Sequence, residues 1–243
     1  MNPTKLFPLL AAACAALSAC KGEDPQAAAQ AAAAQAAARE AAADKVAAQF
    51  DEAVAGEKWQ LAKGYGDILL AEHPDSAAVA RIKPQHDAIK AKAEAEREQK
   101  RLAGLWAYGN EPVKGGAQLS AAIYARENVD VDGSGAKPVR LIFRDHPDWG
   151  RSAYLVLEAG DFDCYGGCKV KVAFDDAAAK PMSAWRPKTD EAIAMFIEDH
   201  RALWKQAKTS KRLAIEFPTK AVGRRTAEFD VGGLDPSQLS KWN

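Results

Sequence analysis

The amino-acid composition changes sharply at about Leu105, and this change constrains the fold more than any other feature of the sequence. Before it, alanine and charged helix-forming residues dominate. After it, β-branched and aromatic residues recur in short runs that Gly, Pro and Asp separate, which is typical of strands and turns. The sequence therefore predicts an α+β protein, in which an N-terminal helical segment precedes a mostly antiparallel β-sheet or sandwich covered by one long helix.

The C-terminal domain is predicted to span residues 105–243 and to hold most of the strands. Val170, Val172 and Phe174 alternate with polar or small residues, and this period of two predicts one buried and one solvated face. The predicted strands cover residues 105–110, 117–126, 139–144, 154–158, 168–174, 213–217 and 227–231.

The long helix is predicted over residues 190–208, with Thr189 as its N-cap. Apolar residues recur there at helical spacing and would pack on the sheet. His200 lies on the same stripe, and no Cys, His or acidic residue stands at helical spacing from it, so we interpret it as a packed residue rather than a metal ligand. The stripe consists of Ile193, Phe196, Ile197, His200, Leu203 and Trp204.

The chain before residue 105 is predicted to form a tether and then a helical hairpin. Residues 20–44 are rich in alanine and hold no large apolar residue, which favours a semi-rigid spacer. The alternative, an alanine-faced coiled coil, lacks the branched residues that such seams prefer. Residues 45–104 carry larger apolar residues at helical spacing, with a break at Gly56 and a stop before Pro74.

Part of this hairpin resembles a single tetratricopeptide unit. The resemblance implies two antiparallel helices that pack closely through small residues and end at a proline. Because only one unit is visible, we expect Trp59 and Tyr65 to serve helix packing, with peptide binding as the alternative. The matching residues are Ala53, Gly56, Trp59, Ala62, Tyr65, Leu69 and Pro74.

Residues 1–19 have the features of a secretory signal peptide. Lys5 precedes an apolar run over residues 6–19, which is shorter than a membrane span. The run ends in Leu17-Ser18-Ala19-Cys20, which resembles the lipobox of bacterial lipoproteins. The resemblance implies cleavage before Cys20 and acyl chains on its sulfur. The alternatives are an ordinary signal peptide with a chance cysteine and an uncleaved anchor.

The expected location follows from this anchor. Lys21, rather than Asp, comes after the modified cysteine, and by resemblance to enterobacterial lipoproteins this favours the outer membrane, facing the periplasm. The equal numbers of basic and acidic residues, 33 of each, argue against a nucleic-acid partner. The expected partners are the membrane, through the acyl chains on Cys20, and a protein or cell-wall component; no cofactor is predicted.

Cys164 and Cys168 bracket the tripeptide Tyr165-Gly166-Gly167. Neighbouring cysteines in an exported chain tend to oxidise, and the two glycines allow a sharp turn, so a structural disulfide is favoured. A redox pair is one alternative, although such pairs usually have two intervening residues at a helix start. A metal clip is the other, although zinc would need two further ligands.

Residues 128–135 alternate oxygen-bearing side chains and have a glycine at the sixth position, as the calcium loop of an EF-hand does. The twelfth position should hold a bidentate acid but is Val139, and strands rather than helices are predicted on both sides. We therefore expect an Asx-rich hairpin turn, with a calcium site as the alternative.

The C-terminal domain also resembles an uncharacterised domain of exported bacterial proteins. The likeness covers about residues 105–242 and rests on residues 161–176, on Phe196-Ile197 and on a closing run at 229–234. A weaker likeness is to accessory envelope proteins of type VI secretion and to invasion-associated periplasmic proteins. These resemblances imply a fold and an exported location, and they carry no catalytic residues.

Two functions are weighed on these features. The leading hypothesis is a non-enzymatic envelope lipoprotein that displays a binding or structural domain in the periplasm. The rival is a periplasmic hydrolase or metal-dependent enzyme that uses loop carboxylates of Asp130, Asp145 and Asp161. A deep pocket that gathers these acids with His146 would favour the rival.

Exposed aromatic residues could mark a recognition surface on such a domain. Trp149 and Tyr165 are the candidates, because both stand in predicted turns. Trp106, Trp185 and Trp204 are expected in the core instead.

Overall fold

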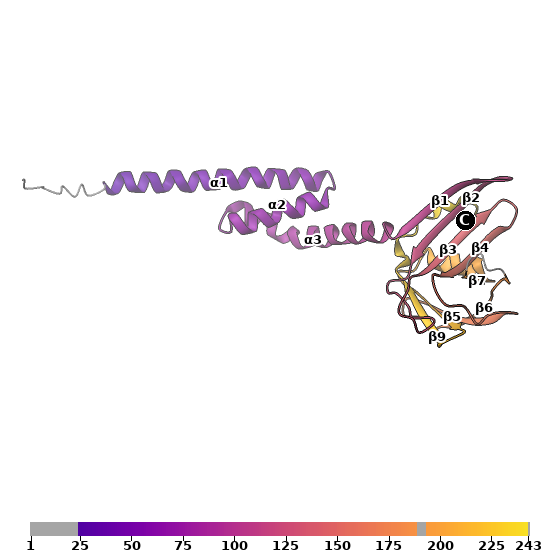
Figure 1. The fold of residues 1–243 in the computed structure, drawn as a ribbon. Helices are drawn as coiled ribbons and strands as arrows, with labels where there is room; N and C mark the ends of the chain where they lie inside the picture. The colour runs from indigo at the N-terminus through magenta and orange to yellow at the C-terminus, as the bar shows by residue number, and fades with distance from the viewer. Residues whose placement is uncertain (1–23, 189–192, 243) are drawn as a thin grey trace, which may run out of the picture. The chain divides into compact units, whose positions relative to one another are not determined.

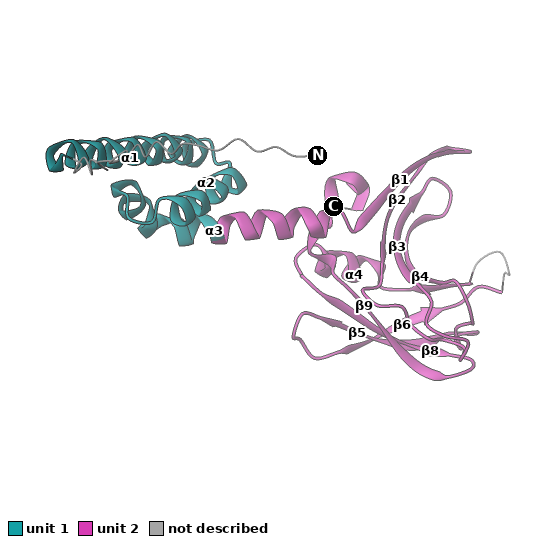
Figure 2. Ribbon diagram, turned by 60° about the vertical axis from the view of Figure 1, so that its left-hand side comes forward, with its two compact units in different colours: residues 1–90 teal, residues 91–243 magenta. Residues whose placement is uncertain are grey.

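The computed structural model describes residues 24–188 and 193–242, which form two compact units divided between Lys90 and Ala91 (Figure 2). Several predictions fall outside the described residues: the signal peptide, the lipobox with Cys20, the N-cap at Thr189 and the start of the helix predicted over 190–208.

Unit 1 consists of helices, as the composition predicts. Helix α1 spans Pro25–Ala55, α2 spans Trp59–Glu72, and α3 begins at Ala77 and continues to Ala103 in unit 2 (Figure 1). Asp24 caps α1 by accepting a hydrogen bond from the backbone N–H of Gln26 at 2.9 Å. Helix α2 ends before Pro74, as predicted.

The core of unit 1 lies between the second half of α1 and its two partner helices. In α1, Ala43, Ala47 and Phe50 are buried at helical spacing, whereas the residues from 25 to 42 are exposed or, at Glu40, half-exposed. The alanine-rich part of α1 therefore adds no core, and its contact with the start of α3 is a hydrogen bond from the backbone N–H of Ala77 to Glu40 at 2.8 Å. The core residues are Ala43, Ala47, Phe50, Ala53, Ala62, Leu69, Ala78, Val79, Ile82 and Ile89.

Unit 2 is built on one nine-stranded antiparallel sheet in the order β1-β2-β3-β4-β7-β6-β5-β8-β9. The predicted class, helices followed by a mostly antiparallel sheet, is confirmed. The strands are β1 Trp106–Val113, β2 Gly116–Tyr124, β3 Val139–His146, β4 Gly150–Leu157, β5 Cys168–Phe174, β6 Lys180–Trp185, β7 Ile193–Ile197, β8 Leu213–Thr219 and β9 Gly223–Phe229.

The prediction of one long helix over residues 190–208 is wrong. Its first apolar residues form β7, and among residues 193–208 only His200–Ala207 are helical, as α4. Strand β7 is paired with β4 on one side and β6 on the other, and residues on both of its faces are largely covered. A strand covered on both faces is a continuous apolar run, and such a run also satisfies helical spacing.

The core of unit 2 lies on one side of the sheet, where α4 and the 3-10 segment η2 (Pro236–Trp242) pack against it. Phe143 is at the centre, with ring centroids 5.0 Å from Trp204 and 5.5 Å from Trp242. His200 contributes to this packing, with its ring 5.6 Å from that of Trp242. Figure 2 shows α4 on the hollow side of the curved sheet.

Candidate binding surface

The strands of unit 2 have two faces with different side chains. On β3, Leu141 and Phe143 point into the core, while Arg140, Ile142 and Arg144 point to the opposite side, as the alternation of a strand requires. We call the side opposite the core the outer face. Neither α4 nor η2 covers it, because both pack on the core side.

The register of the sheet aligns aromatic residues across the outer face. Tyr154 of β4 stands opposite Phe196 of β7, and Phe196 stands opposite Trp185 of β6. The ring centroids are 4.8 Å apart in the first pair and 4.9 Å apart in the second. Three rings from three neighbouring strands therefore form one continuous row.

Arg144 and Trp149 extend this row at the β3 end. The Cζ atom of Arg144 is 5.2 Å from the ring centroids of both Tyr154 and Trp149 and 5.9 Å from that of Phe196. Guanidinium groups stack favourably on aromatic faces. We call Trp149, Arg144, Tyr154, Phe196 and Trp185 together the aromatic strip.

The turn between β3 and β4 holds Trp149 over the outer face. The Nδ1 atom of His146 accepts hydrogen bonds from the backbone N–H groups of Asp148 at 3.1 Å and Trp149 at 3.4 Å. The indole stacks on the imidazole at 4.0 Å between centroids and is still 70% exposed. Gly150 completes the turn with a φ of 66°, a left-handed conformation that favours glycine.

The electrostatics of the aromatic strip are cationic. Burial raises the pKa of Tyr154, and the positive charges of Arg144 and Arg140 oppose that rise only in part. Glu111 is the carboxylate that acts on Tyr154. Neither arginine has a carboxylate within ion-pair distance among the residues that the structure describes, and Nε of Arg144 is buried without a hydrogen-bond partner there.

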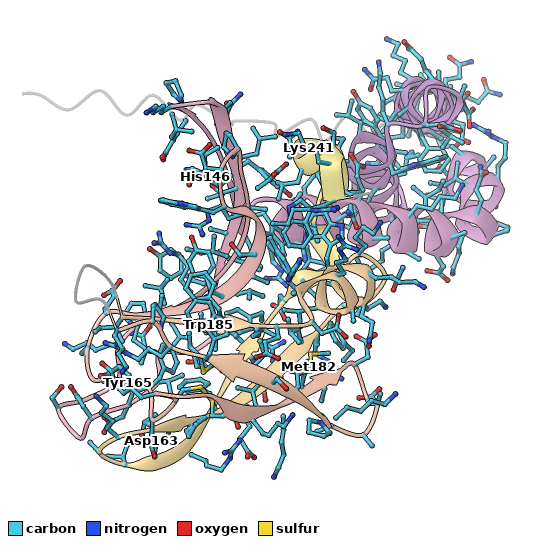
Figure 3. All side chains as sticks on the ribbon, turned by 90° about the vertical axis from the view of Figure 1, so that its right-hand side faces the viewer. His146, Asp163, Tyr165, Met182, Trp185 and Lys241 are labelled. Carbon is cyan, nitrogen blue, oxygen red and sulfur yellow. A yellow bond between two sulfur atoms is a disulfide. The ribbon has the colours of Figure 1, made fainter. Side chains whose placement is uncertain are left out.

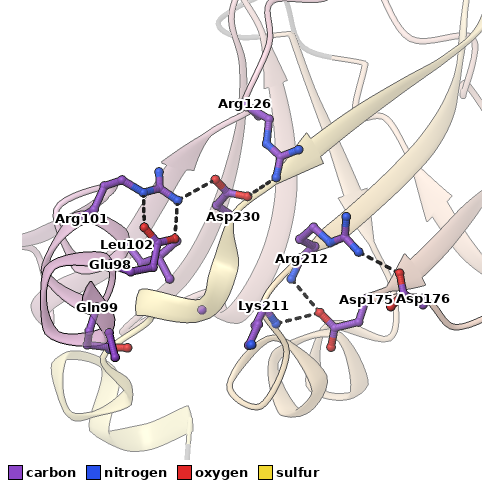
Figure 4. Close-up of a pocket in the computed structure, with 12 residues that line it drawn as sticks. Glu98, Gln99, Arg101, Leu102, Arg126, Asp175, Asp176, Lys211, Arg212 and Asp230 are labelled. Carbon is purple, nitrogen blue, oxygen red and sulfur yellow. Dashed lines mark hydrogen bonds and ion pairs between the residues drawn. The ribbon is translucent and has the colours of Figure 1, made fainter. Parts of the chain in front are cut away.

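A different site in unit 2 is a charged groove of about 810 Å³ (Figure 4). Asp230 accepts from Arg126 at 2.5 Å and from Arg101 at 3.2 Å. Burial opposes ionisation of Asp230, but these hydrogen bonds outweigh it and lower the pKa of Asp230.

Two further acids of the groove also have hydrogen-bond partners. Asp175 accepts from the backbone N–H groups of Lys211 and Arg212, each at 2.9 Å, and Asp176 pairs with Arg212 at 2.8 Å. Acidic and basic side chains are equal in number among its lining residues, so the groove has no preferred sign of ligand charge. The charged lining residues are Glu98, Arg101, Arg126, Asp175, Asp176, Lys211, Arg212 and Asp230.

The acids and the histidine of the rival hypothesis are not gathered in one pocket. Asp145 and His146 are neighbours on β3 and therefore point to opposite faces of the sheet. Asp145 is buried, and the Nζ atom of Lys241 lies 3.7 Å from its Oδ2 atom. Asp130 accepts a hydrogen bond from the backbone N–H of Gly133, and Asp161 pairs with Lys220. The three acids and His146 are absent from the lining of the five main cavities in the described part of the chain.

The loop over residues 128–135 forms Asx turns, as predicted. Asp130 accepts from the backbone N–H of Gly133 at 2.7 Å, and Asp132 accepts from that of Ser134 at 2.9 Å. Within residues 24–188 and 193–242, no group of three or more His, Cys, Asp or Glu side chains is placed to hold a metal ion.

Cys164 and Cys168 lie with their sulfur atoms at bonding distance, 2.03 Å apart. The short loop between them presents Tyr165, which is 41% exposed (Figure 3). Two cations cover its ring: Arg186 Cζ is 4.6 Å and Lys220 Nζ is 4.3 Å from the centroid.

Asp161 joins these two cations. It pairs with the buried Arg186 and with Lys220, whose Nζ atom is 2.6 Å from its Oδ2 atom. Burial opposes ionisation of Asp161, but the hydrogen bonds from Lys220 and Arg186 outweigh it and lower the pKa of Asp161. This acid therefore neutralises a buried guanidinium, which is a structural role.

Sequence reasoning placed some of the tryptophans correctly. Trp106 and Trp204 are buried and Trp149 is exposed, as predicted. The prediction that Trp185 lies in the core is wrong: it is 42% exposed, because Ala184 takes the inward position of β6 and turns its neighbour to the outer face.

Among the residues described, no helix combines the length and the apolar character that crossing a membrane requires. No protein-family model, no curated protein and no solved structure matches this chain.

Proposed function

We propose that the chain is a lipoprotein of the bacterial envelope, anchored through acyl chains on Cys20 in the outer membrane, and that its C-terminal unit binds a partner in the periplasm. The observation that carries the proposal is the apolar run over residues 6–19 that ends in Leu17-Ser18-Ala19-Cys20. Each acyl methylene buried in a bilayer contributes about 0.8 kcal/mol, so two or three chains hold a protein firmly.

The exposed part of α1 supports the spacer role. Residues 25–42 contribute nothing to the core of unit 1, and a helix of this length extends about 27 Å. An extended helix that follows the modified cysteine would separate that core from the lipid surface.

The outer face supports a binding role for unit 2. Exposed large apolar residues are normal when they are scattered, but a continuous cluster marks an interaction site more often. Trp149 and Trp185 belong to one such cluster, held on a rigid sheet.

The anchor is tested by metabolic labelling of the full chain with radioactive palmitate in a bacterial host. The unsubstituted chain should carry the label, sediment with membranes and have an intact mass that begins at a diacylated Cys20. Cys20→Ala should abolish the label. Cys14→Ala is the matched control, because Cys14 precedes the cleavage site, and it should be labelled normally.

An unlabelled chain that keeps residues 1–19 would overturn the proposal. So would label that persists in Cys20→Ala, because the acyl chains would then be attached elsewhere.

A further inference from the structure

We infer that the aromatic strip binds a carboxylate-bearing glycan, with sugar rings stacked on the aromatic side chains and carboxylates paired with Arg144 and Arg140. The inference rests on the proposed function for the compartment in which such a glycan, that of the cell wall, is met. It names the chemical class of the partner, which the anchor leaves open.

The first argument is the shape of the surface. The strip crosses β3, β4, β7 and β6, which are adjacent in the sheet, so its outer strands are separated by about 14 Å. A row of rings of this length suits a linear ligand that lies across the strands. The strip lines none of the five main cavities of the described residues, so an extended chain suits it better than a small enclosed molecule.

The second argument is the chemistry of the rings. Each pyranose ring has a face of C–H bonds whose slight positive charge is attracted to the negative face of an aromatic ring. Trp149 and Trp185 are 70% and 42% exposed at the two ends of the strip. Each has one ring face covered, by His146 and by Phe196 respectively, so a sugar would stack on the opposite face. Aromatic side chains have few rotatable bonds, so they lose little conformational entropy on binding.

The third argument is charge complementarity. The guanidinium of Arg144 is held among Trp149, Tyr154 and Phe196, and that of Arg140 lies 5.8 Å from the ring of Tyr124. Neither forms an ion pair with any carboxylate in the described part of the chain, whereas Arg101, Arg126 and Arg212 of the groove in Figure 4 each pair with a carboxylate. Arginine pairs with carboxylates through two parallel hydrogen bonds, so an acidic ligand suits these two guanidinium groups.

Nucleic acid is a poorer match to the same surface. Its affinity comes mainly from many phosphate contacts, and the strip offers two guanidinium groups in a chain of zero net charge. A glycan with spaced carboxylates requires fewer cations and more stacking surface.

The test measures binding of the full chain, in non-ionic detergent, to purified peptidoglycan sacculi by co-sedimentation. Trp149→Ala should weaken binding about tenfold, the loss expected from one stacked ring. Trp149→Phe should restore part of it. Leu61→Ala is the control for loss of an exposed apolar side chain, because Leu61 is 52% exposed on α2 in unit 1, and it should bind normally.

Charge is tested separately. Arg144→Gln should weaken binding to sacculi about tenfold, while Arg39→Gln, an exposed arginine of α1, should not. Amidation of the sacculus carboxylates should weaken binding of the unsubstituted chain at least as much, because Arg140 loses its partner too, and it should weaken binding of Arg144→Gln by a smaller factor. Chitin has similar sugar rings without carboxylates, so the chain should bind it more weakly than sacculi. Trp149→Ala should weaken binding to chitin further, and Arg144→Gln should leave it unchanged.

Two results would overturn the inference. One is binding to sacculi that neither Trp149→Ala nor Arg144→Gln reduces. The other is equal or tighter binding to phosphatidylglycerol vesicles that the same substitutions abolish, which would identify a lipid surface instead. If palmitate labels Cys20 but sacculi are not bound, the glycan inference fails and the proposed anchor stands.

Discussion

A β-carbon on Gly66 of α2 would lie 2.3 Å from the Cδ2 atom of His86 in α3. The imidazole is 6% exposed, and its Nε2 atom lies 3.2 Å from Oδ1 of Asp67, the residue after the glycine. The two helices of unit 1 therefore approach each other at a position that has room only for hydrogen.

Gly66→Ala is expected to destabilise unit 1 by about 1–3 kcal/mol, because the buried imidazole must move to admit the methyl group. Gly64→Ala is the matched control two residues earlier in α2, where a β-carbon meets nothing within 4 Å. Alanine is a better helix former than glycine, so the free energy of unfolding of Gly64→Ala should rise by about 0.5–1 kcal/mol. Thermal unfolding followed by circular dichroism at the helical band measures both, and a shift in the same direction for the two variants would contradict the expectation.

A second glycine controls the close contact between η1 (Val231–Gly233) and the end of α3 within unit 2. A β-carbon on Gly233 would lie 2.2 Å from the backbone carbonyl carbon of Leu102. The backbone cannot rotate away as a side chain can, so Gly233→Ala should lower the free energy of unfolding by about 3 kcal/mol. At Gly232 the nearest atoms are 3.4 Å away, so Gly232→Ala should cost much less. Tryptophan fluorescence during denaturation would report the difference, because Trp204 and Trp242 lie in the core of this unit.

The contrast among β5, β6 and β7 shows what the sequence can predict. Strand β5 was predicted with its observed bounds because its buried valines alternate with lysines. Strand β6 was missed because Lys180 and Pro181 begin it and no β-branched residue follows. Strand β7 fits a helical pattern as well as a strand because its residues are apolar on both faces, so the alternation that identifies a strand is missing.

The aromatic strip depends on the pairing that the sequence does not reveal. Trp149 was recognised as a candidate for recognition because it stands in a turn rich in Pro and Asp. Its connection to Trp185 requires β7 to insert between β4 and β6, out of chain order. Such long-range pairing leaves no local pattern, so the residues of the strip could be listed but not assembled.

Replacement of both Cys164 and Cys168 by serine should lower the free energy of unfolding by about 1–2 kcal/mol, because a loop with so few residues removes little entropy from the unfolded chain. The same loop carries Tyr165 against Arg186, so the tyrosine fluorescence should also change. Denaturation with and without a reducing agent measures the effect. Reduction of the unsubstituted chain should reproduce the double variant, and a stability that does not respond to reduction would show that the bond contributes nothing.

Asp161 should make unit 2 sensitive to acid. Its pKa in the folded chain is below the ordinary value of 3.8, because hydrogen bonds from Lys220 and Arg186 outweigh the opposing effect of burial. A carboxyl whose folded pKa is lowered stabilises the fold fully above its unfolded pKa, and this contribution is lost as the pH falls through the folded value. Stability should therefore decline below about pH 4, and Asp161→Asn should show a smaller decline, since an amide does not titrate in this range. The substitution should also lower stability near neutral pH by about 3 kcal/mol, because the buried Arg186 loses its counter-charge. Urea denaturation at a series of pH values tests both expectations, and an Asp161→Asn curve that runs parallel to that of the unsubstituted chain through the acid range would assign the acid sensitivity to other carboxylates.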